Sequence, residues 1–243
     1  MNATVSLVVA ALLVGVSAPA VSAPNLVLNG GFEATATSAP FANTEFGSSF
    51  PSGNGPANWA SPSNSAYNLY FDAATAATVS ANSRFGGSQK LASSYTGASP
   101  NGGRFVALDG DTEFNGPLTQ TISGLTSGAQ YELNFFWAAS QLDNRTGETT
   151  ERLAVTFGGV TQLTSVLTIP TQGFSGWLSQ AFTFTASGAT DVLSFLSLGT
   201  PNGLPPIALL DGVSLTEVPE PTSMALLAAG LLGAGLVRRR RAS

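Results

Sequence analysis

The chain has 243 residues, of which only 9% are charged, and it contains 27 glycines, no cysteine and no histidine. Without cysteine there are no disulfides and no thiolate chemistry, and without histidine the commonest general base and metal ligand are missing. A polar surface built mainly from Ser, Thr, Asn and Gln favours a β-rich, turn-rich protein over a helical one.

The charges are distributed unevenly along the chain. Four of the nine basic residues form the cluster Arg238–Arg241, and up to Val237 five basic residues face 14 acidic ones, a net charge of −9. So acidic a body repels a phosphate backbone. We therefore expect no nucleic-acid partner.

The N-terminal sequence is typical of a secretory signal peptide, which we assign to residues 1–23. The apolar stretch LVVAALLVGVSAPAVSA ends in small residues, although Met1–Ser6 lacks the usual Lys or Arg. Small-x-small sites end at Ala20 and at Ala23. We favour cleavage after Ala20, because cleavage after Ala23 puts Pro24 into an extended protease site that it fits poorly. The alternative is a buried N-terminal helix.

The body, residues 24–217, alternates short apolar runs with turn sequences such as SGLTSG, FGG and TPNG. Strands at roughly ten-residue spacing, with no helical period, predict one all-β domain folded as an antiparallel jelly-roll β-sandwich. Period-two alternation and apolar runs predict its strands over Arg104–Leu108, Gln130–Ala139, Arg152–Phe157, Gln180–Thr185, Asp191–Leu198 and Ile207–Leu215.

The segment from Phe32 to Tyr95 is rich in Ala, Ser, Asn and Gly and carries scattered aromatic residues. This composition predicts long loops, which commonly carry binding residues. Aromatic rings stack on the apolar faces of sugar rings, so Trp59, Tyr67 and Tyr70 are the predicted sugar-binding residues. The alternative is that these three rings fill the core, where large aromatic side chains are common.

Residues 218–243 combine three parts in order: the tetrapeptide Val218-Pro219-Glu220-Pro221, an apolar run and a basic cluster. The apolar run predicts a transmembrane helix over 223–237. Its 14 apolar residues span about 21 Å, less than the roughly 30 Å hydrocarbon core of a bilayer. The positive-inside rule keeps the basic cluster cytoplasmic and the body outside. The cluster consists of Arg238, Arg239, Arg240 and Arg241.

These three parts resemble the PEP-CTERM sorting signal of exopolysaccharide-producing Gram-negative bacteria. The resemblance implies that an exosortase recognises Pro219, Glu220 and Pro221 and cuts nearby, after transient anchorage in the inner membrane. The exported body is then released or transferred at the cell surface or into the extracellular space. The alternative is an ordinary C-terminal membrane anchor.

Three short motifs of the body also resemble a known fold. They are NLVLNGGFE at residues 25–33, LTQTISGL at 118–125 and ALLDGVSL at 208–215. Together they resemble the galactose-binding-like jelly rolls of carbohydrate-binding modules. The resemblance implies one structural calcium ion held by Glu33 and Asp211, and calcium's preference for six to eight oxygen ligands agrees with two carboxylates in Gly-rich turns. The alternative is that both acids cap surface turns.

A further acidic run, Asp109-Gly110-Asp111-Thr112-Glu113, does not fit an EF-hand, because Phe114 occupies the position of the required glycine. It predicts a solvated turn after the strand Arg104–Leu108. A glycosidase needs two carboxylates at a defined separation. The sequence offers Asp109, Asp111, Glu113 and Asp211 but fixes no such separation.

We therefore expect a secreted, surface-sorted protein of the extracellular matrix or biofilm. It is expected to be non-catalytic and to contact exopolysaccharide. The alternatives are a surface enzyme that acts on polysaccharide through paired carboxylates, and a structural coat protein without a ligand.

Overall fold

The computed structural model describes residues 23–50 and 54–219, and every regular element in this part of the chain is a strand. The eleven strands are β1 (Thr44–Phe46), β2 (Asn68–Asp72), β3 (Arg104–Asp109), β4 (Leu118–Ser123), β5 (Gln130–Gln141), β6 (Thr149–Phe157), β7 (Val160–Leu163), β8 (Leu167–Ile169), β9 (Leu178–Thr185), β10 (Thr190–Thr200) and β11 (Pro206–Glu217).

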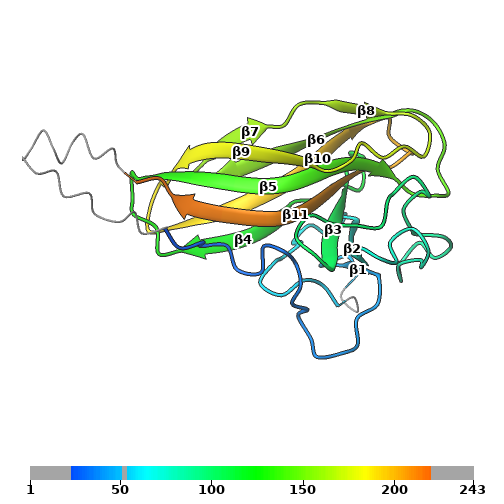
Figure 1. Ribbon diagram of the computed structural model, residues 1–243, viewed down its shortest axis with the longest axis horizontal. Helices are drawn as coiled ribbons and strands as arrows, with labels where there is room; N and C mark the ends of the chain where they lie inside the picture. The colour runs from blue at the N-terminus through cyan, green and yellow to red at the C-terminus, as the bar shows by residue number, and fades with distance from the viewer. Residues whose placement is uncertain (1–22, 51–53, 220–243) are drawn as a thin grey trace, which may run out of the picture.

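Two antiparallel sheets pack face to face (Figure 1). The first has the order β1-β2-β3-β11-β5-β9, and the second has the order β4-β10-β6-β7, with β8 also paired to β6. The final strand β11 therefore lies in the middle of the first sheet, between β3 and β5. The prediction of an all-β, jelly-roll sandwich is confirmed.

The long strands appear where the sequence alternates apolar and polar residues. In β5, Tyr131, Leu133, Phe135 and Trp137 are all buried in the main core between the sheets. Their period of two places them on one face of the strand. All six predicted strands are present, and each extends one to three residues beyond the predicted bounds at one or both ends.

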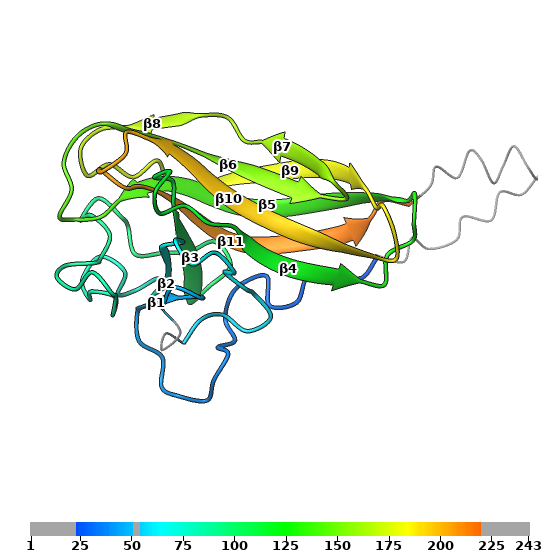
Figure 2. The same cartoon turned by 180° about the vertical axis from the view of Figure 1, so that it is seen from behind.

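A second apolar core lies on the outer face of the first sheet. Leu69 and Phe71 of β2 and Phe105 of β3 pack there against Leu91 and Tyr95 from the connecting segment. Residues 73–103 contain no strand and cover this face as loops, seen beside β1, β2 and β3 in Figure 2. The scattered aromatic residues of the loop-rich segment thus have a packing role.

The opening segment of the body joins the closing strand directly. The Leu26 N–H donates to the Leu215 carbonyl oxygen at 2.9 Å, and the Val213 N–H donates to the Gly30 carbonyl oxygen at 2.9 Å. A Cβ on Gly30 would lie 1.9 Å from the Val213 carbonyl oxygen, so only glycine fits there. The two outer motifs that carried the resemblance are therefore neighbours in space.

No helix in residues 23–50 or 54–219 has the length and apolar character needed to cross a membrane. Residues 1–22 of the predicted signal peptide and the predicted helix over 223–237 lie outside the described residues.

Candidate functional site

Two of the predicted sugar-binding aromatic residues lie in the main core. Trp59 is 8% exposed and packs against Phe32, with ring centroids 5.3 Å apart, while Tyr70 is fully buried against Phe41 at 4.9 Å. The Trp59 indole N–H donates to a backbone carbonyl at 3.0 Å, and the Tyr70 hydroxyl donates to the Phe32 carbonyl. Tyr70 offers no free face to a sugar, so the prediction of stacking is wrong for this residue, which fills the core as in the alternative. Trp59 also packs in the core, but it lines a separate surface pocket of about 460 Å³, so its contact with a sugar stays a prediction.

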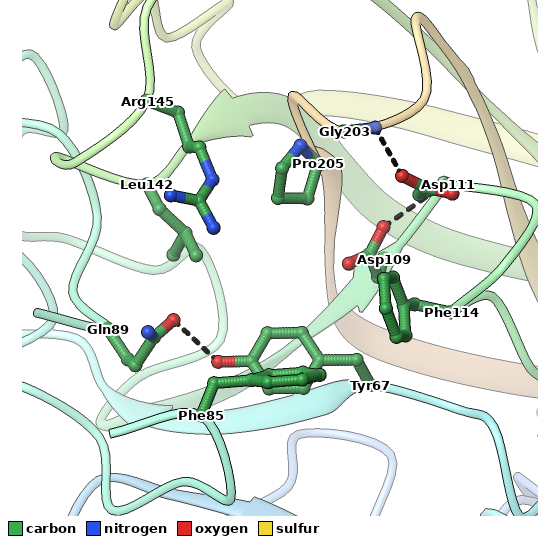
Figure 3. A pocket seen from close by; sticks show the side chains of 10 residues that line it. All are labelled: Tyr67, Phe85, Gln89, Asp109, Asp111, Phe114, Leu142, Arg145, Gly203 and Pro205. Atoms are coloured by element: carbon green, nitrogen blue, oxygen red, sulfur yellow. Dashed lines mark hydrogen bonds between the residues drawn. The ribbon is translucent and has the colours of Figure 1, made fainter. Parts of the chain in front are cut away.

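Tyr67, the third predicted residue, lines a pocket of about 240 Å³ at the end of β3 (Figure 3). The walls come from the residue before β2, the loop around residues 85–89, the turn 109–114, the loop 142–145 and the turn 203–205. These five segments are far apart in sequence and converge at one place.

An aromatic cluster forms one wall of the pocket. Phe85 makes edge contacts with Tyr67 and with Phe114, at centroid distances of 5.1 and 5.3 Å. The Arg84 guanidinium lies 5.0 Å from the Phe85 ring centroid and forms an ion pair with the buried Glu45 at 3.2 Å. Phe85 remains 52% exposed. The pocket therefore presents an exposed aromatic ring held by packed neighbours.

The polar groups beside this wall are bonded to one another. The Tyr67 hydroxyl donates to Gln89 Oε1 at 2.7 Å and accepts from the Ser83 hydroxyl at 3.2 Å. Gln89 Nε2 in turn donates to the Gly86 carbonyl at 2.7 Å. Burial raises the pKa of the Tyr67 hydroxyl, which therefore stays protonated.

The turn after β3 is not solvated as predicted, because Asp109 and Asp111 are each only 2% exposed. Asp109 Oδ1 accepts the Asp111 N–H at 2.7 Å. Asp111 accepts the N–H groups of Glu113 and Gly203 at 2.9 and 2.5 Å. The aspartates satisfy backbone donors of the turn, as Asp side chains commonly do. Only Thr112 and Glu113 of the acidic run face solvent.

A third buried carboxyl group lies next to this turn. Glu151 of β6 is fully buried and accepts the Ser197 hydroxyl at 3.1 Å, while its Oε1 has no hydrogen-bond partner among the described residues. Gly110 packs closely against it: a Cβ there would lie 2.7 Å from the Gly199 nitrogen and 3.1 Å from Glu151 Oε2. Burial raises the pKa of Glu151 well above its usual value, and the charge of Asp109 adds to the rise.

Burial raises the pKa of Asp109 to about 7. The charge of Asp111 adds to this rise, and the hydrogen bond from the Asp111 N–H and the charges of Arg145 and Arg84 oppose it. The folded protein therefore binds a proton here that the unfolded chain releases at about pH 4.

This shift makes the protein more stable in mild acid. Because the folded-state pKa is raised, the stabilisation is complete below the unfolded pKa and is lost as the pH rises through about 7. For Asp109 alone we expect the free energy of unfolding, measured with urea, to be about 2 to 3 kcal/mol higher at pH 5 than at pH 8. Asp109→Asn should reduce the measured difference by about this amount, leaving the part that comes from Glu151 and Asp211, and Asp143→Asn should keep the whole difference. Stability that rises from pH 5 to pH 8 would contradict the assignment.

Several pocket residues were not singled out from the sequence. Phe85 appeared only as one of many scattered aromatic residues, and Arg145 lies in a polar loop between two predicted strands. Figure 3 shows the Arg145 guanidinium directed into the pocket. The sequence gives one sign that Arg145 deserves notice as a binding residue: it is one of only five basic residues before Val237.

The two predicted calcium ligands face one loop, residues 99–104. Asp211, at a bulge in β11, accepts the Ser99 hydroxyl and, at 3.0 Å, the Asn101 N–H. Glu33 Oε1 accepts the Arg104 N–H at 2.9 Å. Burial raises the pKa of Asp211 to about 6, and the nearby charge of Glu33 adds to the rise. The structure therefore brings the two carboxylates near each other, away from the pocket.

The C-terminal residues match a described family. Residues 217–241 fit the family model of the PEP-CTERM protein-sorting motif. The chain carries a PEP-CTERM sorting signal. This PEP-CTERM signal indicates export, with a transiently membrane-anchored C-terminus before the protein reaches the cell surface or the extracellular space.

Solved structures similar to the body are β-domains of low sequence identity. The structure of TmCBM61 in complex with β-1,4-galactotriose is 13% identical, with 80% of this chain and 99% of that chain covered and a TM-score of 0.39. The CBM22-1 xylan-binding domain from Paenibacillus barcinonensis Xyn10C is 12% identical, with 83% and 99% covered and a TM-score of 0.37.

A third similar structure is the EclA C-terminal domain, a sugar-binding protein. It is 16% identical, with a TM-score of 0.32, and the match covers 40% of this chain and 64% of that chain. No curated protein matches the chain by sequence. At these identities the likeness concerns the fold alone.

Proposed function

We propose that this protein is a non-catalytic carbohydrate-binding protein that its PEP-CTERM signal delivers to the cell surface, where it contacts exopolysaccharide of the matrix or biofilm. The observation that carries the proposal is the pocket of Figure 3, which combines the exposed ring of Phe85 with polar groups fixed around it. An apolar wall with a few convergent polar groups is typical of small-ligand sites.

The size of the pocket suits one sugar ring. Its volume of about 240 Å³ is below the roughly 300–1,000 Å³ of pockets for drug-sized ligands. The apolar C–H face of a pyranose complements the exposed Phe85 ring, and the sugar hydroxyls can bond to Asp109 and Arg145 at the pocket wall. The proposed ligand is therefore a single residue of a polysaccharide, at a chain end or a branch.

The arrangement of the carboxylates supports binding over catalysis. Glycosidases flank the scissile bond with an acid and a base or nucleophile about 5 to 9.5 Å apart. Here Asp109 and Asp111 come from one turn, and both oxygens of Asp111 accept backbone N–H groups. Glu151 is fully buried beside Gly110, and Asp211 faces the 99–104 loop. Of these four groups only Asp109 and Asp111 line the pocket, and both come from the same turn.

Phe85→Ala tests the proposed site. Loss of the stacking surface is expected to weaken binding by about 1 to 2 kcal/mol, about 5- to 30-fold in Kd. The measurement is affinity electrophoresis of the full chain in detergent through gels that contain a panel of polysaccharides. Val192→Ala is the matched control, because Val192 of β10 is also 52% exposed and does not line the pocket. Unretarded migration of the unmodified protein in every gel would favour the ligand-free coat protein.

We also propose that one calcium ion joins Glu33 and Asp211. The Glu33 and Asp211 carboxylates face the 99–104 loop, and together with the Ser99 hydroxyl of that loop they supply oxygen ligands. Glycine at position 103 leaves room for Glu33, because a Cβ there would lie 3.0 Å from Glu33 Oε2. Calcium at a hundredfold excess over Kd is expected to stabilise the fold by about 2 to 3 kcal/mol. Thermal unfolding with calcium and with EDTA measures this. Asp211→Asn should abolish the difference and Asp191→Asn should keep it, whereas identical melting curves for the unmodified protein would refute the site.

A further inference from the structure

Arg145 brings to the pocket a positive charge that no acidic side chain in residues 23–50 or 54–219 balances through an ion pair. Arg84 pairs with Glu45 at 3.2 Å and Lys90 with Asp143 at 3.5 Å. The Nε of Arg145 is buried and has no hydrogen-bond partner in the same part of the chain. Leaving a buried donor of a charged group unmet is costly. A ligand that brings a negative charge to the part of the guanidinium that lines the pocket would offset this cost.

The loop that carries Arg145 is held firmly by its neighbours. The Ser88 hydroxyl donates to the Asp143 carboxylate at 2.7 Å, Asn144 Nδ2 donates to the Ser88 carbonyl at 2.7 Å, and Gln172 Nε2 donates to the Asp143 carbonyl at 2.6 Å. The side chains of Asp143 and Asn144 thus form hydrogen bonds with neighbouring loops, while the Arg145 side chain points into the pocket (Figure 3). A binding group held in advance loses little freedom when the ligand arrives.

The other polar groups of the pocket leave few open positions. Tyr67 and Gln89 bond to each other, and both oxygens of Asp111 accept backbone N–H groups. Asp109 has one oxygen engaged by the Asp111 N–H. Burial raises the pKa of Asp109 to about 7, so in mild acid this group is neutral and its O–H can donate a hydrogen bond to a ligand oxygen. The groups that face a ligand are therefore a guanidinium, one carboxyl group and the ring of Phe85.

Building on the proposed sugar-binding function, we propose that the pocket selects a sugar ring that bears a carboxylate, a uronic acid, and that Arg145 binds this carboxylate. The planar fork of a guanidinium matches a carboxylate with two parallel charge-assisted hydrogen bonds. The apolar face of the same ring lies on Phe85, and a ring hydroxyl or ring oxygen meets Asp109. A neutral hexose can contact the Phe85 ring and the Asp109 carboxyl group, but it brings no negative charge to the Arg145 guanidinium.

The charge of the rest of the protein limits how such a polymer is bound. Up to Val237 the chain carries a net charge of −9, which repels a long polyanion laid along its surface. A pocket that takes one ring avoids this repulsion, because only one carboxylate approaches the body closely. Recognition is therefore directed at a terminal or branching uronic acid.

Matched monosaccharide pairs that differ only at carbon 6 test this selection. The full chain in detergent is titrated with glucuronic acid and glucose, and with galacturonic acid and galactose, and Kd is measured by ligand-observed NMR. Each acid is expected to bind at least about tenfold more tightly than its neutral partner. Arg145→Gln should remove this difference and Arg145→Lys, which keeps the charge without the fork, should reduce it severalfold. Arg152→Gln, a variant of an arginine outside the pocket, should keep it.

The outcomes separate this inference from the proposed function. Equal binding of acidic and neutral sugars, both lost in Phe85→Ala, would overturn the selection for uronic acids and leave the sugar pocket standing. Absence of binding for all four sugars and for every polysaccharide would overturn both. If Arg145→Gln does not fold, as judged by its melting curve, the Arg145→Lys titration decides the inference: an undiminished preference for the acids would overturn it.

Discussion

Replacing Tyr70 with alanine is expected to lower the free energy of unfolding by about 3 to 5 kcal/mol, a large part of the stability of an ordinary domain. The ring is fully buried between the sheets and contacts Phe41 and Phe46, and its hydroxyl donates to the Phe32 carbonyl. The substitution leaves a cavity and an unpaired carbonyl group. Urea unfolding followed by tryptophan fluorescence measures the loss.

The conservative variant Tyr70→Phe is the matched control. It keeps the ring and removes one hydrogen bond, so it should cost only about 1 to 2 kcal/mol. A Tyr70→Ala protein that keeps its stability and loses sugar binding would contradict the core position and restore the stacking role predicted from the sequence.

Replacing Pro219, Glu220 and Pro221 together with alanine is expected to stop processing of the C-terminus. The full chain, with Arg238–Arg241 attached, should then accumulate in the membrane fraction, whereas the unmodified protein loses this segment. Residues 217–241 match the sorting motif, which includes all of these positions. Mass spectrometry of the membrane and released fractions measures the effect.

Phe85→Ala is the control for this experiment, because a pocket variant should be processed normally. Release of the triple-alanine protein in the same amount and with the same C-terminus as the unmodified protein would refute a role for these three residues in processing.

The parts of the fold that the sequence predicted well are those with a single buried face. Strand β5 alternates buried and exposed side chains over most of its length, so its period of two is visible in the sequence. The short strand β2 is different, because four of its five residues are buried. Its outer face lies under the loops of 73–103, and burial on both faces removes the alternation. For this reason β2 was not predicted.

The same double burial explains the error over Tyr70. A loop-rich segment with scattered aromatic residues is compatible with exposed stacking platforms and with a second core. The choice for Tyr70 depends on which residues cover the inner face of β2, where its ring lies in the main core. That coverage comes from contacts far apart in sequence, such as those of Tyr70 with Phe41 and Phe46. No local pattern encodes them.

The site itself was only partly predictable. The sequence pointed to Tyr67 and to the acidic run Asp109–Glu113, and the structure places both at the pocket. It did not indicate that Asp109 is buried, because the covering residues Arg145 and Phe85 come from distant loops. The opening and closing motifs, in contrast, predicted their own proximity: Glu33 and Asp211 face the same loop.

A crystal structure of the protein with the most tightly bound saccharide tests the central claim most directly. The account predicts one sugar ring in the pocket between Tyr67 and Arg145, with its apolar face on Phe85 and no bond of the saccharide broken. A saccharide bound elsewhere on the sandwich, with this pocket unchanged, would contradict it.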